Sequence, residues 1–211
     1  MKLTIFGATG ATGTNLVRQA LAAGHSVTAV VRDPARLAVP AHQRLRVVTA
    51  DVMDPAAIGP VVAGADAVLS AVGPHGTGPT TVIQDSVSGI IRAMEKAGTR
   101  RLLMISGSIV TDAGERPLLR YLVKPFARRT FLRGVCADMR QAEDEVRQSP
   151  LEWTIFRPPR LTGKPAAGSY RTAIGRNLPR GLTISAADLA ACMLTMIDDP
   201  AAMRACVCVA N

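Results

Sequence analysis

Aromatic residues and cysteines are scarce in this 211-residue chain, and long hydrophobic runs are missing. Four Phe, two Tyr and one Trp are fewer aromatics than an all-β sandwich normally uses. The four cysteines form no C-x-x-C pair and have no histidine nearby, which argues against zinc or a disulfide framework and favours a reducing cytoplasm. No apolar run approaches the roughly 18 residues of a membrane span, and the short first run ends in glycines, so we expect neither a signal peptide nor membrane contact.

Basic residues outnumber acidic ones by 25 to 16, which gives a formal net charge of +9. A basic surface attracts anionic partners such as nucleotides, phosphates and acidic small molecules, although charge alone does not choose among them. Hydrophobic residues make up 48% of the chain and charged residues 19%, a composition typical of a globular protein. The length suits one domain covering residues 1–211.

Short β-branched runs alternate with helical patterns along the chain. The runs predict strands at 3–6, 27–31, 45–49, 67–72, 102–105, 153–156 and 207–209. Apolar spacing and capping signals predict a helix ending at Gly24, a short helix opened by Pro55, a long helix ending at Gly98, and a helix from 185 to 197. This alternation predicts a single-domain α/β Rossmann fold, a doubly wound and mostly parallel sheet with helices on both faces. Two irregular stretches, 108–135 and 158–183, follow strands and should form the substrate side.

The sharpest motif is a glycine-rich stretch, Gly7-Ala8-Thr9-Gly10-Ala11-Thr12-Gly13, between the first predicted strand and the first predicted helix. Glycines permit a tight turn, close approach of the backbone to a diphosphate and close packing of helix against strand. The helix N-terminus adds unpaired N–H groups and a positive dipole end, and threonine hydroxyls can donate as well. The motif therefore predicts a dinucleotide-binding turn whose contact residues are Gly7, Thr9, Gly10, Ala11 and Thr12.

Arginine stands where an NAD-binding protein usually has an acidic residue. Arg32 ends the second strand, about 20 residues beyond the loop, and Arg36 follows one helical turn later. Two guanidinium groups suit a 2′-phosphate, so the sequence predicts NADP(H) in preference to NAD(H). Asp33 leaves two alternatives open, a contact with the ribose or a surface pair with Arg32.

The G-x-x-G-x-x-G spacing resembles that of the extended and atypical short-chain dehydrogenase/reductases. A narrower resemblance, to the family of biliverdin reductase B (NADPH flavin reductase) and to the NmrA-like proteins, rests on further segments: Val31-Arg32-Asp33 with Arg36, Gly78-Pro79-Thr80-Thr81-Val82, Pro158-Pro159, and Leu161-Thr162-Gly163 with Gly168-Ser169-Tyr170. These resemblances imply cofactor contacts from Asp51, Val52, Ala71, Val72, Gly73 and Pro158. They also imply hydride transfer from NADPH to a conjugated acceptor, namely a flavin, a quinone or a linear tetrapyrrole.

The Tyr-x-x-x-Lys pair that donates a proton in ordinary short-chain dehydrogenases is missing. Tyr121 is followed by Lys124, one residue too early, and Tyr170 is followed by Ile174. An ordinary alcohol dehydrogenase mechanism is therefore not expected. A conjugated acceptor does not require that hydride delivery coincide with protonation by a tyrosine, so a solvent proton can suffice.

Three residues remain as candidates for the reacting end. The family's serine aligns with Gly107, which leaves Ser106 and Ser108 as substitutes, although Ser106 could equally cap the end of its strand. Arg160 replaces the family's histidine after the double proline. A guanidinium does not donate a proton at neutral pH but can hold a carboxylate, a phosphate or a flavin carbonyl. The alternative for Arg160 is a solvated loop position.

Basic residues recur every four positions in the segment 116–133, at Arg116, Arg120, Lys124 and Arg128, and Arg129 and Arg133 join this series. Three interpretations stay open: a solvated face, a cover that attracts anionic substrates, and a nucleic-acid surface. Nucleic acid is the least favoured because aromatic residues are not interleaved with the charges.

Two classes of function agree with these observations. The first is an NADPH-dependent reductase of a conjugated or anionic small molecule. The second is an NADP(H)-binding redox-sensing regulator of the NmrA type without turnover, and an epimerase or dehydratase is less favoured because it needs the missing proton pair. The sequence predicts no metal site, and it leaves open whether the protein is a monomer or a dimer.

Overall fold

The computed structural model describes residues 1–74, 76, 80–114, 126 and 133–211. The strands within these residues are β1 (Lys2–Phe6), β2 (Ser26–Val31), β3 (Leu45–Thr49), β4 (Ala67–Ser70), β5 (Arg101–Ile105), β6 (Glu152–Arg157), β7 (Arg160–Thr162), β8 (Arg171–Ile174), β9 (Thr183–Ser185) and β10 (Ala205–Ala210). The α-helices are α1 (Ala11–Ala22), α2 (Pro55–Val62), α3 (Val82–Ala97), α5 (Arg133–Gln148) and α6 (Ala186–Thr195). Short 3₁₀ turns include η1 (Pro34–Arg36) and η2 (Ser108–Val110).

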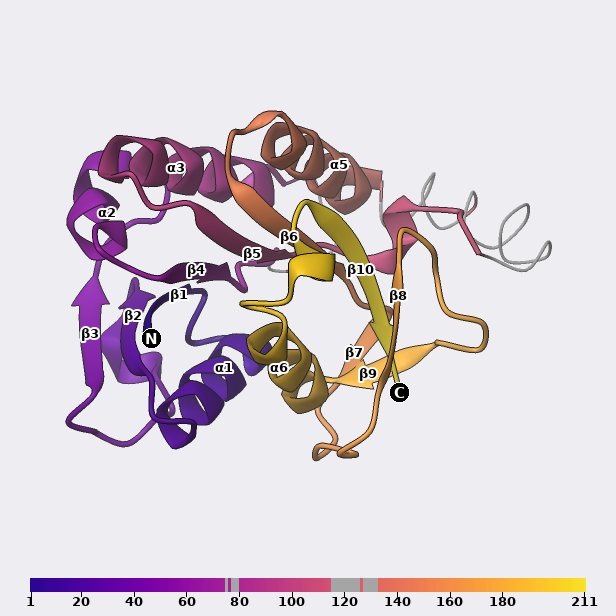
Figure 1. The fold of residues 1–211 in the computed structure, drawn as a ribbon, viewed down its shortest axis with the longest axis horizontal. Coiled ribbons are helices and arrows are strands. Elements are labelled where there is room, and N and C mark those ends of the chain that lie inside the picture. The colour runs from indigo at the N-terminus through magenta and orange to yellow at the C-terminus, as the bar shows by residue number, and fades with distance from the viewer. Residues whose placement is uncertain (75, 77–79, 115–125, 127–132) are drawn as a thin grey trace.

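The main sheet of the described residues has eight strands in the order β3-β2-β1-β4-β5-β6-β10-β8. Every neighbouring pair is parallel except β10 with β8, and β7 and β9 form a separate parallel pair. Helices lie on both faces of the sheet (Figure 1). The predicted doubly wound, mostly parallel α/β fold is therefore confirmed.

Alternate residues of each strand enter two separate cores, as a sheet covered on both faces requires. Leu3 and Ile5 of β1 pack with residues of α1 and α6, whereas Phe6 packs with residues of α2, α3 and α5. These core side chains are at most 1% exposed. Both cores hold the carboxyl ends of β1 and β4 in place, and the glycine loop starts at that edge.

The helix boundaries follow the capping signals. Gly24 and Gly98 end the first and the long helix in the left-handed conformation, at φ of 86° and 73°. Asp54 opens α2 by accepting hydrogen bonds from the amides of Ala56 and Ala57 at 2.9 and 3.3 Å. The Ser185 hydroxyl accepts from the Asp188 amide at 2.9 Å and opens α6. These predicted helix ends are confirmed, although α6 finishes at Thr195 rather than at 197.

Two parts of the sequence interpretation are corrected. The stretch 158–183 is not irregular, because it contains β7 and β8 and leads into β9. Strands β7 and β8 are three and four residues long and largely exposed, so they lack the alternating burial that identifies a strand in sequence. Helix α5 was not predicted. The basic series 116–133 lies outside the described residues except for its last member, Arg133. None of the helices in the described part of the chain is long and apolar enough to cross a membrane.

Candidate cofactor site

The loop between β1 and α1 is built on close backbone contacts that only glycine permits. Gly7 has φ +71°, and a Cβ atom there would lie 2.6 Å from the carbonyl carbon of Ala71 after β4. A Cβ atom on Gly13 would lie 2.1 Å from the carbonyl oxygen of Gly7. The Gly10 amide closes the turn by donating to that oxygen at 3.0 Å. The first and third glycines thus bring β1, β4 and α1 together at one point.

Helix α1 begins without a cap. Gly10 occupies the N-cap position, and no side chain accepts a hydrogen bond from the first turn. Within the described residues, the amides of Ala11, Thr12 and Gly13 have no partner. The four unpaired amides that normally begin a helix attract anions, and the helix dipole adds to this attraction.

Helix α3 starts at the same edge of the sheet, but the amides of its first turn have hydrogen-bond partners. The buried carboxylate of Asp138, on α5, accepts from the amides of Ile83 and Gln84 at 3.1 and 2.8 Å. The Thr80 hydroxyl accepts from Val82 at 3.2 Å. The N-terminus of α3 is therefore already occupied by groups of the protein, whereas that of α1 is available to a ligand.

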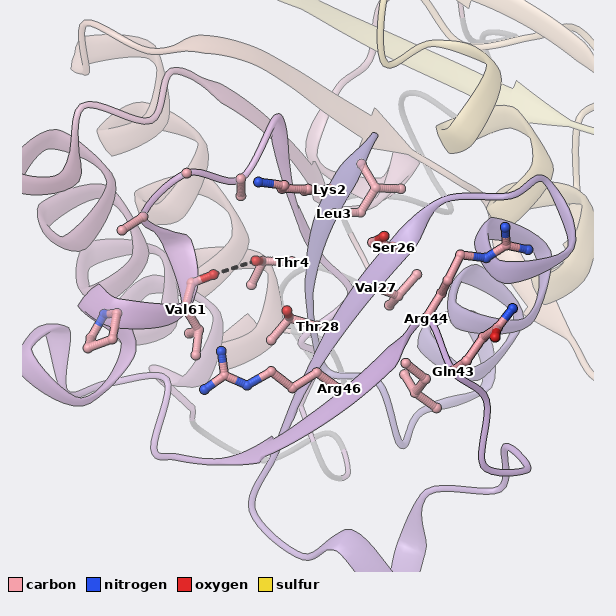
Figure 2. Close-up of a pocket in the computed structure, with 15 residues that line it drawn as sticks. Lys2, Leu3, Thr4, Ser26, Val27, Thr28, Gln43, Arg44, Arg46 and Val61 are labelled. Carbon is pink, nitrogen blue, oxygen red and sulfur yellow. Dashed lines mark hydrogen bonds between the residues drawn. The ribbon is translucent and has the colours of Figure 1, made fainter.

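A cavity of about 230 Å³ opens beside the glycine loop. Its lining brings together residues from β1, the glycine loop, β2 and the turn after it, the segments that follow β3 and β4, and α3: Phe6, Gly7, Thr9, Gly10, Val30, Val31, Arg32, Arg36, Ala50, Asp51, Val52, Met53, Ala71, Val72, Gly73, Val82 and Ser86. Ten of the thirteen residues predicted to contact the cofactor line this cavity, Arg32 and Arg36 among them. Ala11, Thr12 and Pro158 do not line it. A larger cavity of about 410 Å³ lies at the opposite, amino-terminal edge of the sheet (Figure 2).

The two arginines and the acidic residue between them have different surroundings. Arg32 and Arg36 are exposed and line the cavity. The Asp33 carboxylate accepts a hydrogen bond from the Ala35 amide at 3.0 Å and caps η1. Asp33 is therefore engaged in its own turn, which leaves the two guanidinium groups as the charged side chains of this wall.

The far wall of the cavity is mostly apolar. Asp51 accepts from the Met53 amide at 3.0 Å, so its carboxylate folds the segment after β3. Ser86 of α3 was not predicted, although it lies on the helix face already marked by Ile83 and Ile90. It is 0% exposed, and its hydroxyl has no partner among the described residues. A buried hydroxyl without a partner is costly, so Ser86 is a candidate for a hydrogen bond to a bound base.

The residues predicted for the reacting end lie at the same edge of the sheet but outside this cavity. The amides of Ser106 and Ser108 donate to the carbonyl oxygens of Phe156 and Pro158 at 2.7 and 2.8 Å, which joins the ends of β5 and β6. The Ser106 hydroxyl is buried and faces the carboxylate of Glu143, whose pKa it helps to lower. Arg160 is exposed in β7, opposite Thr183 of β9.

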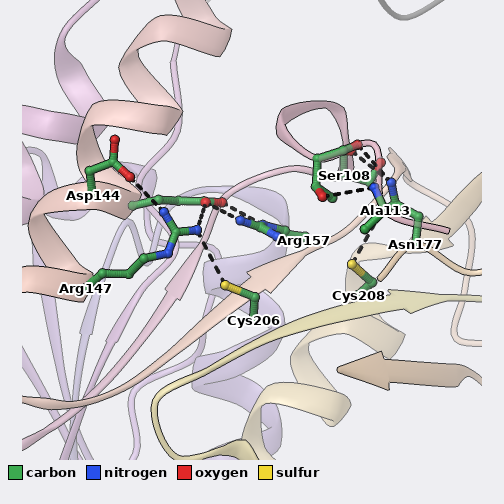
Figure 3. Close-up of polar contacts among 10 residues, drawn as sticks. Ser108, Ala113, Asp144, Arg147, Arg157, Asn177, Cys206 and Cys208 are labelled. Atoms are coloured by element: carbon green, nitrogen blue, oxygen red, sulfur yellow. Dashed lines mark hydrogen bonds and ion pairs between the residues drawn. The ribbon is translucent and has the colours of Figure 1, made fainter. Parts of the chain in front are cut away.

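A buried ion network joins α5 to β6 through Arg147 and Arg157 (Figure 3). Glu143 of α5 is 1% exposed and receives hydrogen bonds from Arg157 at 2.9 and 2.5 Å and from Arg147 at 2.5 Å. Burial raises the pKa of the Glu143 carboxyl, but the hydrogen bonds and charge of Arg157 outweigh this effect and hold the pKa below its ordinary value. Glu143 is thus an ionised structural group. Sequence spacing could have revealed its i,i+4 pair with Arg147 but not its contact with β6.

Helix α5 supplies no proton donor of the ordinary short-chain type. Its sequence from Arg133 to Gln148 contains neither tyrosine nor lysine. At the end of β5, the Met139 sulfur would lie 3.2 Å from a Cβ atom on Gly107, so an apolar side chain packs beside the strand end. No cluster of three or more potential metal ligands occurs in the part of the chain that the structure describes.

A carboxylate from α6 fixes the segment between β7 and β8. The buried Asp188 accepts from the amides of Ala167 and Gly168 at 2.9 and 3.1 Å and from the Ser185 hydroxyl at 2.7 Å. Burial raises the pKa of Asp188, but these hydrogen bonds lower it below the ordinary value. The predicted substrate-side stretch is therefore tied to the fold by an ionised group.

The NAD(P)H-binding family model matches residues 7–200, which is most of the chain and includes the glycine loop and both walls of the cavity. The chain belongs to the NAD(P)H-binding family. Among curated proteins, Photosystem II assembly factor Ycf39 from Synechocystis is 30% identical over 120 residues. That match takes in 56% of this chain and only 36% of the Synechocystis protein.

Solved structures of other proteins share the complete fold. The crystal structure of a protein from Burkholderia pseudomallei superposes with a TM-score of 0.82 at 27% identity and covers 100% of both chains. A short-chain dehydrogenase/reductase from Veillonella parvula, solved in complex with NADP, has a TM-score of 0.81 at 18% identity and covers 100% of this chain and 94% of that one. At 18% identity the likeness shows the fold alone.

Proposed function

We propose that this member of the NAD(P)H-binding family is an NADPH-dependent oxidoreductase that reduces a conjugated acceptor, of the flavin, quinone or linear tetrapyrrole class. One observation carries the proposal: the uncapped N-terminus of α1 opens beside a cavity whose outer wall holds Arg32 and Arg36. The amide groups suit a diphosphate, and the arginines suit a 2′-phosphate.

Different residues of the cavity would bind different parts of the cofactor. Thr9, Gly10 and the first turn of α1 would hold the diphosphate, and Arg32 with Arg36 would bind the phosphate on the adenosine ribose. The apolar wall formed by Val52 and its neighbours would pack against the base. When bound, NADPH supplies a hydride. The chain itself offers no tyrosine or lysine on α5 to protonate the product, which favours an acceptor that takes its proton from solvent.

The same observation on α5 favours one alternative, an NADP(H)-binding redox sensor that does not turn over. An epimerase or dehydratase would need a proton-transferring pair at this position, and α5 offers none. The resemblance to NADPH flavin reductases supports the reductase. A sensor would instead act through a macromolecular partner.

The test combines binding with turnover. Purified protein is titrated calorimetrically with NADPH and NADH, and the loss of the NADPH absorbance is followed with FMN, a quinone and biliverdin. We expect tighter binding of NADPH than of NADH and turnover with at least one acceptor. Tight binding without turnover of any acceptor would instead support the sensor, and absence of binding would refute both.

A double variant tests the assignment of the phosphate. Arg32→Ser/Arg36→Ser should weaken NADPH binding by about 10- to 100-fold, because two charge-assisted contacts at an exposed site are lost. NADH binding should stay nearly unchanged. The control Arg92→Ser/Arg100→Ser removes the same charge from two exposed positions, one in α3 and one directly before β5. Equal weakening by both double variants would show a general charge effect and refute the assignment.

A further inference from the structure

A second polar surface lies at the amino-terminal edge of the sheet, on the face covered by α2. The parallel register places side chains of β1, β2 and the segment leading into β3 in two adjacent rows: Lys2, Ser26 and Arg44 in the first, and Thr4, Thr28 and Arg46 in the second. Members of one row lie about 4.8 Å apart along the row, and the rows are about 6.6 Å apart along the strands. Six polar side chains are thus gathered on one face.

The next row on the same face of the sheet consists of apolar side chains, as is usual where a helix covers a sheet. Phe6, Val30 and Val48 follow in register and pack into the core with α2 and α3. Helix α2 ends at Val62, and the first two rows lie beyond its cover. Every position of the first two rows except Thr4 is at least partly exposed. The sequence therefore changes from apolar to cationic and hydroxylic at the point where the helix stops.

The two rows form the floor of the cavity of about 410 Å³ (Figure 2). Its lining includes Lys2, Arg44 and Arg46 but no acidic residue. In the described part of the chain, none of these three cations forms an ion pair with a carboxylate. Asp66 directly follows the lining residue Ala65 in sequence. Its carboxylate accepts a hydrogen bond from the Lys2 backbone amide at 2.6 Å.

The donors of this surface are spread across the cavity. Figure 2 shows Arg46 extending toward the side of Val61 and Arg44 toward the opposite side. The Thr4 hydroxyl donates to the Val61 carbonyl at 2.6 Å, whereas the hydroxyl of Thr28, between the arginines, has no hydrogen-bond partner within the described residues. An anion that contacts both guanidinium groups must therefore be longer than a single phosphate.

We propose that these two rows form a second anion site, which binds a small ligand carrying two or more phosphate groups in series. Arginine forks and hydroxyl groups are the donors that phosphate oxygens prefer, and the cavity has the size of a small-molecule site. The site is separate from the cofactor cavity, because the two lie at opposite ends of β1. The proposed site is at the first residues of β1, and the glycine loop follows its last residue. The five residues of β1 span about 17 Å. The proposal does not depend on the reductase activity.

The test is a calorimetric titration with inorganic pyrophosphate and tripolyphosphate, carried out with and without saturating NADP⁺. Arg44→Gln/Arg46→Gln should weaken binding at least tenfold in both conditions. Arg140→Gln/Arg176→Gln is the matched control, since it removes two exposed arginines elsewhere and should leave the affinity within twofold. Thr28→Val removes a hydroxyl without a change of charge and should weaken binding about threefold or more. Circular dichroism checks that each variant is folded.

Four results would overturn the proposal: equal weakening by the two arginine pairs, no effect of Thr28→Val, loss of all binding when NADP⁺ is present, or no detectable binding. Equal weakening would assign the phosphate binding to bulk charge, and loss of binding with NADP⁺ would assign it to the glycine loop. Comparison of tripolyphosphate with ATP identifies whether a nucleoside adds affinity. Binding of a single-stranded oligonucleotide that pyrophosphate fails to displace would show a nucleic-acid surface instead, and would also refute the proposal.

Discussion

Glu143 offers the sharpest test of how helix α5 is held against strand β6. Its carboxylate receives three hydrogen bonds, two from Arg157 on β6 and one from Arg147 on α5. Glu143→Gln removes the charge and leaves the Arg157 guanidinium, with a side chain only 9% exposed, without a counterion. Breaking one partner of a buried pair costs about 3–5 kcal/mol, and we expect the lower end because glutamine retains one acceptor.

The loss should be visible in thermal unfolding. A cost of about 3 kcal/mol lowers Tm by roughly 6–12 °C in a chain of this size. Asp144→Asn is the control on the same helix, because the Asp144 side chain is 66% exposed and its pair with Arg147 contributes less than about 1 kcal/mol. Unfolding is followed by circular dichroism at neutral pH.

The pH dependence gives a second, independent readout. The folded protein holds the pKa of Glu143 below its ordinary value of 4.5. A carboxyl with a lowered folded pKa stabilises the fold above the unfolded pKa, and this contribution is lost as pH falls through the folded value. The difference between wild type and Glu143→Gln should therefore be constant near neutral pH and shrink below about pH 4.5. A cost no larger than that of Asp144→Asn, or a difference that does not shrink in acid, would refute the reasoning.

Three further variants test other parts of the site. Gly13→Ala places a Cβ atom 2.1 Å from a loop carbonyl, so NADPH affinity measured by calorimetry should fall at least tenfold. Asp138→Ala removes the acceptor of two amides of α3 and should cost about 1–2 kcal/mol in urea unfolding, with Asp138→Asn recovering part of the loss. Asp188→Asn removes a carboxylate with a lowered pKa, so the amides of Ala167 and Gly168 should exchange hydrogen faster than in wild type at neutral pH. Because that stabilisation is lost as pH falls through the lowered pKa, the variant and wild type should converge in strong acid.

Local signals in the sequence were sufficient for the elements around the cofactor cavity. The glycine spacing, the arginines after β2 and the glycine at the end of α3 each act within a few neighbouring residues, so their consequences are readable in order along the chain. Strands β7 and β8 were missed because they are short and largely exposed, so alternating burial does not mark them in the sequence. Ser86, Asp138 and Glu143 were missed for another reason. Their roles come from contacts between elements, and periodicity marks only that such a position is buried.

The reacting end was the least predictable part for a different reason. Its expected residues, Ser106, Ser108 and Arg160, were chosen by resemblance rather than by a local physical requirement. The structure places the two serines where β5 and β6 end, and it places Arg160 on an exposed strand outside the cofactor cavity. Their roles in chemistry remain predictions for the turnover assay.

The pairing of Asp138 with the start of α3 has a consequence for ligand orientation. Helices α1 and α3 both begin at the carboxyl edge of the sheet, and the positive end of α3 is neutralised by the protein itself. A negatively charged ligand that enters the crevice between these two helices consequently finds its electrostatic anchor at α1 rather than at α3. Replacing Asp138 with a neutral side chain would create a rival anchor, and the ligand would then have two competing ways to lie across the sheet.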